Sequence, residues 1–147
     1  MSLQTDIIFV KALSSNTELM ELLPAHNVYN TGIIQPKNGQ DNVKIPYILV
    51  SYDGMTNEAD TKDEYEGDED KVEISIEIAA KNREQLAEIA IMVRDTIRNY
   101  FENADPSDED YNLVPTGYVF SAARVLLDEA KPCFWQTLNY VCDTNVD

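Results

Sequence analysis

Apolar and polar residues alternate along segment 71–80, and the alternation then changes to a helical repeat that continues to residue 101. The apolar positions of the alternating part are Val72, Ile74, Ile76 and Ile78, and the polar positions between them are Glu73, Ser75 and Glu77. Successive side chains of a strand point to opposite faces, so this segment predicts a strand with one buried and one solvated face.

A helix is predicted directly after this strand. Asn82 can act as its N-cap, and Gln85 three residues later completes a capping box. The apolar positions that follow recur at helical spacing and are Leu86, Ile89, Ala90, Val93, Ile97, Tyr100 and Phe101. Segment 71–101 therefore predicts a sheet strand and the helix that covers it.

The remaining patterns predict further elements of the same two kinds. An N-terminal helix is expected over residues 3–14, and it carries Leu3, Ile7, Val10 and neighbouring apolar residues. A capping box at 15–18 would start a short second helix, and Pro24 would end it. Strands are expected at 28–34, 45–52, 118–127 and 134–142. Together these predict a single α+β domain over residues 1–147, with an antiparallel sheet of four or five strands and helices packed on one face.

The last strand carries large apolar groups on both faces, with Phe134, Leu138, Tyr140 and Cys142 on one and Trp135 and Val141 on the other. Such a strand is central in its sheet or is an edge covered by a partner. Cys133 and Cys142 are nine residues apart and fall on opposite faces, so we expect two unpaired cysteines and no disulfide.

The segment between residues 54 and 70 contains no Val, Ile, Leu or Phe, and Lys62 is its one basic residue. A segment with this many charged residues cannot bury enough apolar surface to become ordered by itself. Because the segment joins two strands, it is predicted to form the tip of a long acidic hairpin loop. Long loops of this kind are often functional. The residues predicted to contact a partner are Glu58, Asp60, Asp63, Glu64, Tyr65, Glu66, Asp68 and Glu69. A second acidic loop is expected at 102–110.

The chain has 27 acidic and 11 basic residues, a formal charge of −16. Such a surface repels nucleic acid, because no cluster of basic side chains exists to displace phosphate counterions. No stretch approaches the ~20 apolar residues of a membrane helix, and the run 7–10 is too short for a signal peptide. We therefore expect a soluble protein made in the cytoplasm.

Candidate chemistry is sparse. His26 is the only histidine and follows Pro24 in a connection, where a surface or capping role is expected. The acidic tip fails the spacing of a calcium loop, because counting back from Gly67 places Lys62 at the first ligand position. The sequence therefore assigns no catalytic, cofactor-binding or metal-binding residue, and we expect a protein that is not an enzyme.

The order of elements resembles that of the tail-terminator or tail-completion proteins of long-tailed phages, a head–tail joining family (minor tail protein U-like). The likeness covers residues 5–141. It consists of a helix with a restarted short helix, the Ile-Pro-Tyr-Ile-Leu-Val strand at 45–50, a long hairpin loop, the strand 72–80, the helix 85–101 and two closing strands. It lies in order and spacing and not in a signature residue, and the length and acidity of the 54–70 loop depart from the family.

The resemblance implies a subunit of a ring, typically of six, that caps the tail tube and joins it to the head connector. DNA would pass through the lumen of this ring. The implied partners are further copies of the chain, the tail-tube protein and the head connector. The implied location is the host bacterial cytoplasm during assembly and then the virion tail.

The negative charge is compatible with a DNA conduit, because cationic groups would hold the phosphates and stall transit. The alternative is an acidic interaction module such as a DNA-mimic inhibitor. Its acidic groups should follow helices at phosphate-like spacing, whereas here they concentrate in two loops. An enzyme is disfavoured because no base or nucleophile stands out in the sequence.

Overall fold

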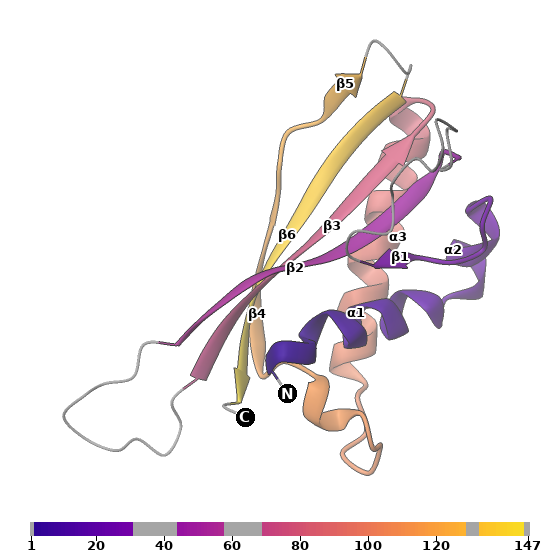
Figure 1. The fold of residues 1–147 in the computed structure, drawn as a ribbon. Coiled ribbons are helices and arrows are strands. Elements are labelled where there is room, and N and C mark those ends of the chain that lie inside the picture. The colour runs from indigo at the N-terminus through magenta and orange to yellow at the C-terminus, as the bar shows by residue number, and fades with distance from the viewer. Residues whose placement is uncertain (1, 31–43, 58–68, 129–132, 146–147) are drawn as a thin grey trace, which may run out of the picture.

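The computed structural model describes residues 2–30, 44–57, 69–128 and 133–145, which form helices and one mixed sheet (Figure 1). The helices are α1 (Thr5–Ser14), α2 (Thr17–Leu22) and α3 (Arg83–Glu102), with short 3₁₀ helices at Ser2–Gln4 and Tyr111–Leu113. The strands are β1 (Tyr29–Asn30), β2 (Tyr47–Asn57), β3 (Glu69–Ala80), β4 (Gly117–Ala122), β5 (Leu126–Asp128) and β6 (Cys133–Asn145). The fold thus belongs to the predicted α+β class.

The sheet order is β1-β2-β3-β6-β4, and β5 pairs with β6 as well. Neighbouring strands are antiparallel except β1 and β2, which are parallel. The predicted antiparallel sheet of four or five strands is therefore wrong, since the described residues form six strands in a mixed sheet. One cause is β1, which lies within the strand predicted at 28–34 but pairs with β2 in the parallel direction, and this makes the sheet mixed.

The other cause is a break in the strand predicted at 118–127. β4 pairs Ala122 with Leu138, whereas β5 pairs Leu126 with Trp135. Between these two pairs the chain moves on by four residues, from Ala122 to Leu126, whereas their partners in β6 are only three residues apart, at Leu138 and Trp135. One extra residue is therefore accommodated between β4 and β5. The Gln136 side chain donates a hydrogen bond of 2.9 Å to the carbonyl of Ala123 within this break.

The predicted strand and helix of segment 71–101 are confirmed as β3 and α3. The four alternating apolar residues of β3 are at most 1% exposed, and four apolar residues of α3 pack in the same core, namely Leu86, Ile89, Val93 and Ile97. Asn82 caps the helix by accepting a hydrogen bond of 2.8 Å from the amide of Gln85. The return bond of the box comes from the amide of Lys81 to the Gln85 side chain, at 2.9 Å.

β6 lies between β3 and the β4 edge, so the central position, one of the two predicted alternatives, is the one observed. Tyr140 of β6 is buried in an aromatic cluster with ring centroids 5.1 Å from Phe9 and Phe120 and 5.4 Å from Tyr118. Neither cysteine forms a disulfide, as predicted; Cys142 is buried and Cys133 is partly exposed.

The predicted N-terminal helix is confirmed as α1, which spans Thr5–Ser14. Leu3 is 67% exposed and Ile7 41% exposed, and Val10 is only partly buried. The buried residues of α1 are instead Thr5, Ile8, Phe9, Ala12 and Leu13. Apolar residues occur all round this helix, so the sequence pattern alone did not determine which face meets the sheet and α3.

The start of the second helix is shifted by one residue from the prediction. Asn16, and not Ser15, caps α2 by accepting a hydrogen bond of 3.2 Å from the amide of Leu19. The Ser15 hydroxyl instead donates to the carbonyl of Ala12, at 2.6 Å. α2 ends at Leu22, just before the predicted terminator Pro24.

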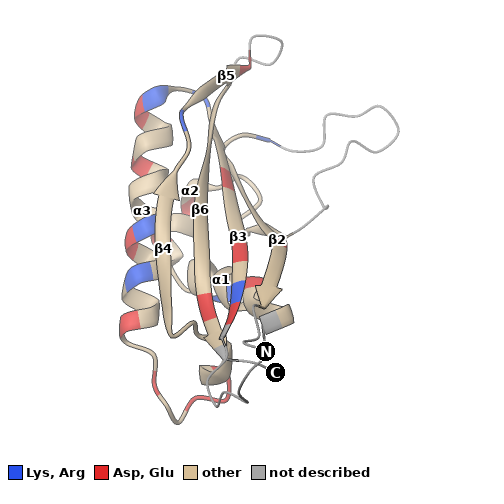
Figure 2. Ribbon diagram, turned by 90° about the vertical axis from the view of Figure 1, so that its left-hand side faces the viewer, with Lys and Arg blue, Asp and Glu red and all other residues tan. Residues whose placement is uncertain are grey.

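The helices cover one face of the sheet and leave the other face open (Figure 2). The core lies between this covered face and the helices α1 and α3, whose buried residues pack against those of β2, β3 and β6. No helix in the described parts of the chain is long and apolar enough to cross a membrane.

Candidate interaction site

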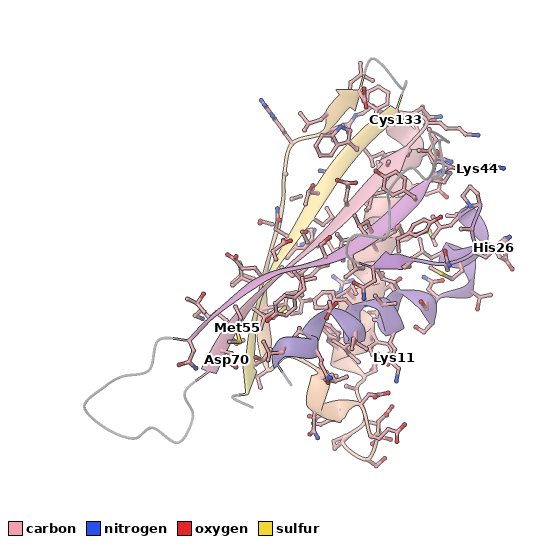
Figure 3. The ribbon with its side chains drawn as sticks, viewed as in Figure 1. Lys11, His26, Lys44, Met55, Asp70 and Cys133 are labelled. Atoms are coloured by element: carbon pink, nitrogen blue, oxygen red, sulfur yellow. The ribbon has the colours of Figure 1, made fainter. Side chains whose placement is uncertain are left out.

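Most of the predicted partner-contact residues lie outside the described residues, namely Glu58, Asp60, Asp63, Glu64, Tyr65, Glu66 and Asp68. Glu69 is the first residue of β3, and its backbone pairs with that of Asn145 in β6. The structure thus describes the base of the acidic hairpin, which Figure 3 marks with the labels Met55 and Asp70.

The strands of the hairpin continue further than the apolar pattern suggested. The sequence predicted a loop from about residue 54 to 70, but β2 runs to Asn57, which lies opposite Asp70 of β3. That boundary is wrong because β3 pairs with β6 on its other side as far as Glu69. Two flanking strands satisfy the backbone groups of these polar residues, which an isolated acidic segment could not do.

A bulge at Asp53 and Gly54 changes the alternation of β2. Tyr52 lies opposite Ile74, whereas Gly54 lies opposite Glu73, so one extra residue is inserted in β2. Gly54 has φ +154°, a conformation that side-chain-bearing residues rarely adopt. After the bulge Met55 lies opposite Val72, on the face of the sheet that the helices cover. Gly54 was the one feature of the sequence that indicated this change in alternation.

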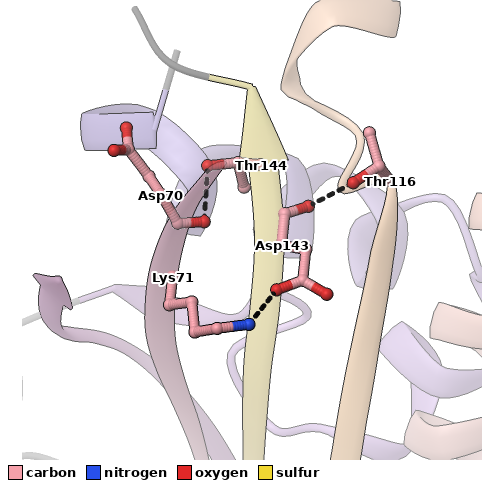
Figure 4. A network of polar contacts seen from close by, with 5 residues as sticks. All are labelled: Asp70, Lys71, Thr116, Asp143 and Thr144. Carbon is pink, nitrogen blue, oxygen red and sulfur yellow. Dashed lines mark hydrogen bonds and ion pairs between the residues drawn. The ribbon is translucent and has the colours of Figure 1, made fainter. Parts of the chain in front are cut away.

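A buried carboxylate stabilises the base of the hairpin. Asp70 is only 4% exposed, and its carboxylate accepts a hydrogen bond of 2.6 Å from the side-chain amide of Asn57. Burying a carboxylate without a donor would be costly, so this bond compensates part of the lost hydration. On the other side of β3, the Thr144 hydroxyl donates to the backbone carbonyl of Asp70 at 3.4 Å (Figure 4).

The next pair of residues joins three strands (Figure 4). The Lys71 ammonium lies 2.6 Å from the Asp143 carboxylate, which connects β3 to β6. The backbone carbonyl of Asp143 accepts hydrogen bonds from the amide of Thr116 at 2.8 Å and from its hydroxyl at 3.0 Å. The Lys71 side chain is 61% exposed, so the ion pair contributes less than about 1 kcal/mol. Its effect is to fix the relative positions of the strand ends.

The open face of the sheet carries one further polar contact. The Tyr47 hydroxyl donates a hydrogen bond of 2.7 Å to the carboxylate of Glu77. Burial, and then this bond to the carboxylate, raise the pKa of Tyr47 above its ordinary value. The phenol is therefore held in its neutral form, as a hydrogen-bond donor to Glu77.

The second acidic loop follows α3 as predicted. The Asp105 carboxylate accepts a hydrogen bond of 2.9 Å from the amide of Ser107, and the hydrogen bonds to Ser107 lower the pKa of Asp105. Asp110 forms an ion pair with Lys11, which ties this loop to α1. Among the described residues no group of three or more His, Cys, Asp or Glu side chains is placed to hold a metal ion.

His26 is exposed after α2, as the sequence predicted (Figure 3). It has φ 54°, and its backbone amide donates a hydrogen bond of 2.9 Å to the carbonyl of Leu23, which closes the end of α2. Its role in the described structure is therefore that of a helix-terminating residue.

Comparison with known proteins adds no family to these observations. No protein-family profile matches the chain, and no curated protein matches it in sequence. The class of the protein therefore rests on its order of elements, its charge and the surfaces described above.

Proposed function

We propose that the chain is a structural subunit of a long phage or prophage tail. Several copies form a ring that terminates the tail tube and joins it to the head connector, and DNA passes through the lumen of this ring. The order of elements over residues 5–141, which resembles that of tail-terminator proteins, supports this proposal. The subunit needs no cofactor and acts by assembly and not by catalysis.

The observation that carries the proposal is the long arm formed by β2 and β3. These strands have 11 and 12 residues, and their pairing extends to Asn57 and Asp70. Figure 1 shows their paired ends projecting past α1, away from the helices. An acidic segment attached to such an arm is well placed to contact a neighbouring subunit or the tail-tube protein.

The distribution of charge on α3 argues against the DNA-mimic alternative. Its exposed acidic residues are interspersed with arginines at 83, 94 and 98, so the helix does not present an uninterrupted row of carboxylates. A protein that imitates DNA needs such a row to occupy a basic groove.

Inactivation of the gene in the phage or prophage that encodes it tests the proposed function. We expect filled heads and separate tails in electron micrographs, because the joining ring is missing. Expression of the wild-type chain from a plasmid should restore joined virions. Normal virions from the inactivated phage would contradict the proposal.

A further inference from the structure

The sheet ends in two lateral edges. β4 pairs with β6 on one side only, and β2 has β1 beside it only at Leu49 and Val50. Among the described residues, β4 and the segment 53–57 of β2 therefore have no strand on their outer side. Such edges offer rows of amide and carbonyl groups to another strand.

The directions of the two edge strands are compatible with each other. β2 is antiparallel to β3, β3 to β6, and β6 to β4, so β2 and β4 run in opposite directions. A rotation about an axis along the strands brings β4 of one copy beside β2 of the next as an antiparallel pair. This contact is head-to-tail, and such contacts generate rings when the rotation closes.

One edge is basic. The Arg94 guanidinium lies 4.5 Å from the ring centroid of Phe120, so this flank of α3 lies against β4. Arg98, four residues on, lies on the same flank. Its side chain is 52% exposed and forms an ion pair of 3.2 Å with Asp95, so Arg98 can contact a further carboxylate only from its exposed side. All four arginines of the chain lie on α3 or just after β4, at 83, 94, 98 and 124. Figure 2 shows basic bands on α3 beside β4, with acidic bands between them. We call β4 with Arg94 and Arg98 the basic edge.

The other edge is acidic. Asp53 is exposed at the bulge of β2, and Asp6 of α1 lies near Tyr52, whose pKa is raised by burial and then by the Asp6 charge. We call segment 53–57 of β2 with Asp6 the acidic edge. Exposed apolar side chains accompany both edges, with Met55 at the acidic edge and Val119 and Ile91 at the basic edge.

Charge determines how copies of this chain can meet. Each copy carries a formal −16, so contacts between like surfaces are repulsive. We propose that the basic edge of one subunit binds the acidic edge of the next copy, by antiparallel pairing of β4 with β2 and by Arg94 and Arg98 facing Asp6 and Asp53. The contact rests on the proposed ring function and specifies its subunit interface. Arginine suits this place because it combines charge, planar hydrogen bonding and apolar contact.

Two charge-reversal variants of the full chain test this contact. The first is Arg94→Glu with Arg98→Glu, and the second is Asp6→Lys with Asp53→Lys. Each alone places like charges at every contact, and we expect each to need at least about tenfold more protein than the wild type for half-assembly in sedimentation velocity. The matched control Lys44→Glu with Lys81→Glu has the same net charge as the first variant and should assemble as the wild type does.

An equimolar mixture of the two variants gives the decisive result. In an alternating ring every contact then pairs opposite charges, so we expect assembly to return to the wild-type level. If Arg94→Glu unfolds the chain by removing the contact with Phe120, Arg98→Glu alone is mixed with the second variant. Wild-type rings that persist in both variants, or a mixture that stays monomeric, would overturn the edge contact and leave the ring function standing. A monomeric wild type would overturn both.

Discussion

At the scale of single residues, the hydroxyl of Tyr140 is buried without a hydrogen-bond partner among the described residues. The Tyr140→Phe variant removes this group and keeps the ring in the aromatic cluster. An unpaired buried hydroxyl costs about 1–3 kcal/mol, so we expect the free energy of unfolding to stay equal or rise by up to that amount. Urea denaturation measures this change.

The matched control for this variant is Tyr47→Phe. It removes a hydroxyl that donates to Glu77, so it should lower the free energy of unfolding by about 0.5–3 kcal/mol. The interpretation of the Tyr140 hydroxyl is wrong if Tyr140→Phe destabilises the protein more than Tyr47→Phe does.

Burial raises the pKa of the Cys142 thiol to about 12, with a smaller contribution from Asp143. In the unfolded chain a thiol titrates near ~8.5, so above that pH the unfolded state binds fewer protons than the native state. The contribution of the Cys142 thiol to the free energy of unfolding is complete below the pKa of the thiol in the unfolded chain. It is lost as the pH rises through the pKa of the thiol in the folded protein. We expect the free energy of unfolding to fall between about pH 8.5 and 12, and Cys142→Ala to remove part of this slope.

Thiol labelling provides a direct check at one pH. At pH 8 we expect an aromatic disulfide reagent to label the partly exposed Cys133 and to leave Cys142 unreacted in the native protein. Equal labelling rates for the two cysteines would contradict the burial of Cys142.

At the scale of elements, the hairpin arm separates folding from assembly. β2 and β3 pair with each other up to Asn57 and Asp70, so we expect that replacing 58–69 by an Asn-Gly turn preserves the fold. Each halving of a loop stabilises by roughly 0.6 kcal/mol, so the melting temperature should stay equal or rise slightly. We also expect this variant to fail to restore joined virions.

A second variant separates the length of the segment from its charge. Changing the seven acidic residues of 58–69 to their amides keeps the length and removes the charge. Loss of folding in the Asn-Gly variant would show that the segment is structural. Full restoration of virions by both variants would show that it has no part in tail joining.

Elements whose signal is local could be predicted from the sequence. The alternation of β3, the cap Asn82 and the repeat of α3 depend on neighbours in the chain, and all three are confirmed. The buried face of α1 and the break after β4 depend instead on distant partners, so the local pattern did not determine them. The bulge at Gly54 belongs to the same group, because a glycine in a strand indicates a bulge only once its partner strand is known.

At the scale of the whole molecule, the formal charge of −16 has one direct consequence. We expect the protein to show no measurable affinity for duplex DNA at low salt, where electrostatic binding is strongest. A gel-shift assay with random-sequence duplex measures this. Micromolar binding would contradict both a DNA conduit and a DNA mimic.

The mass of the native assembly tests the central proposal most directly. The wild-type chain has a mass of 16.7 kDa, and native mass spectrometry counts how many copies form one particle. We predict a single closed species, six copies by the resemblance to tail-terminator proteins, with a central lumen in electron micrographs of the same sample. A monomer or dimer that persists as the protein concentration is raised would contradict the proposal that this chain is a ring subunit.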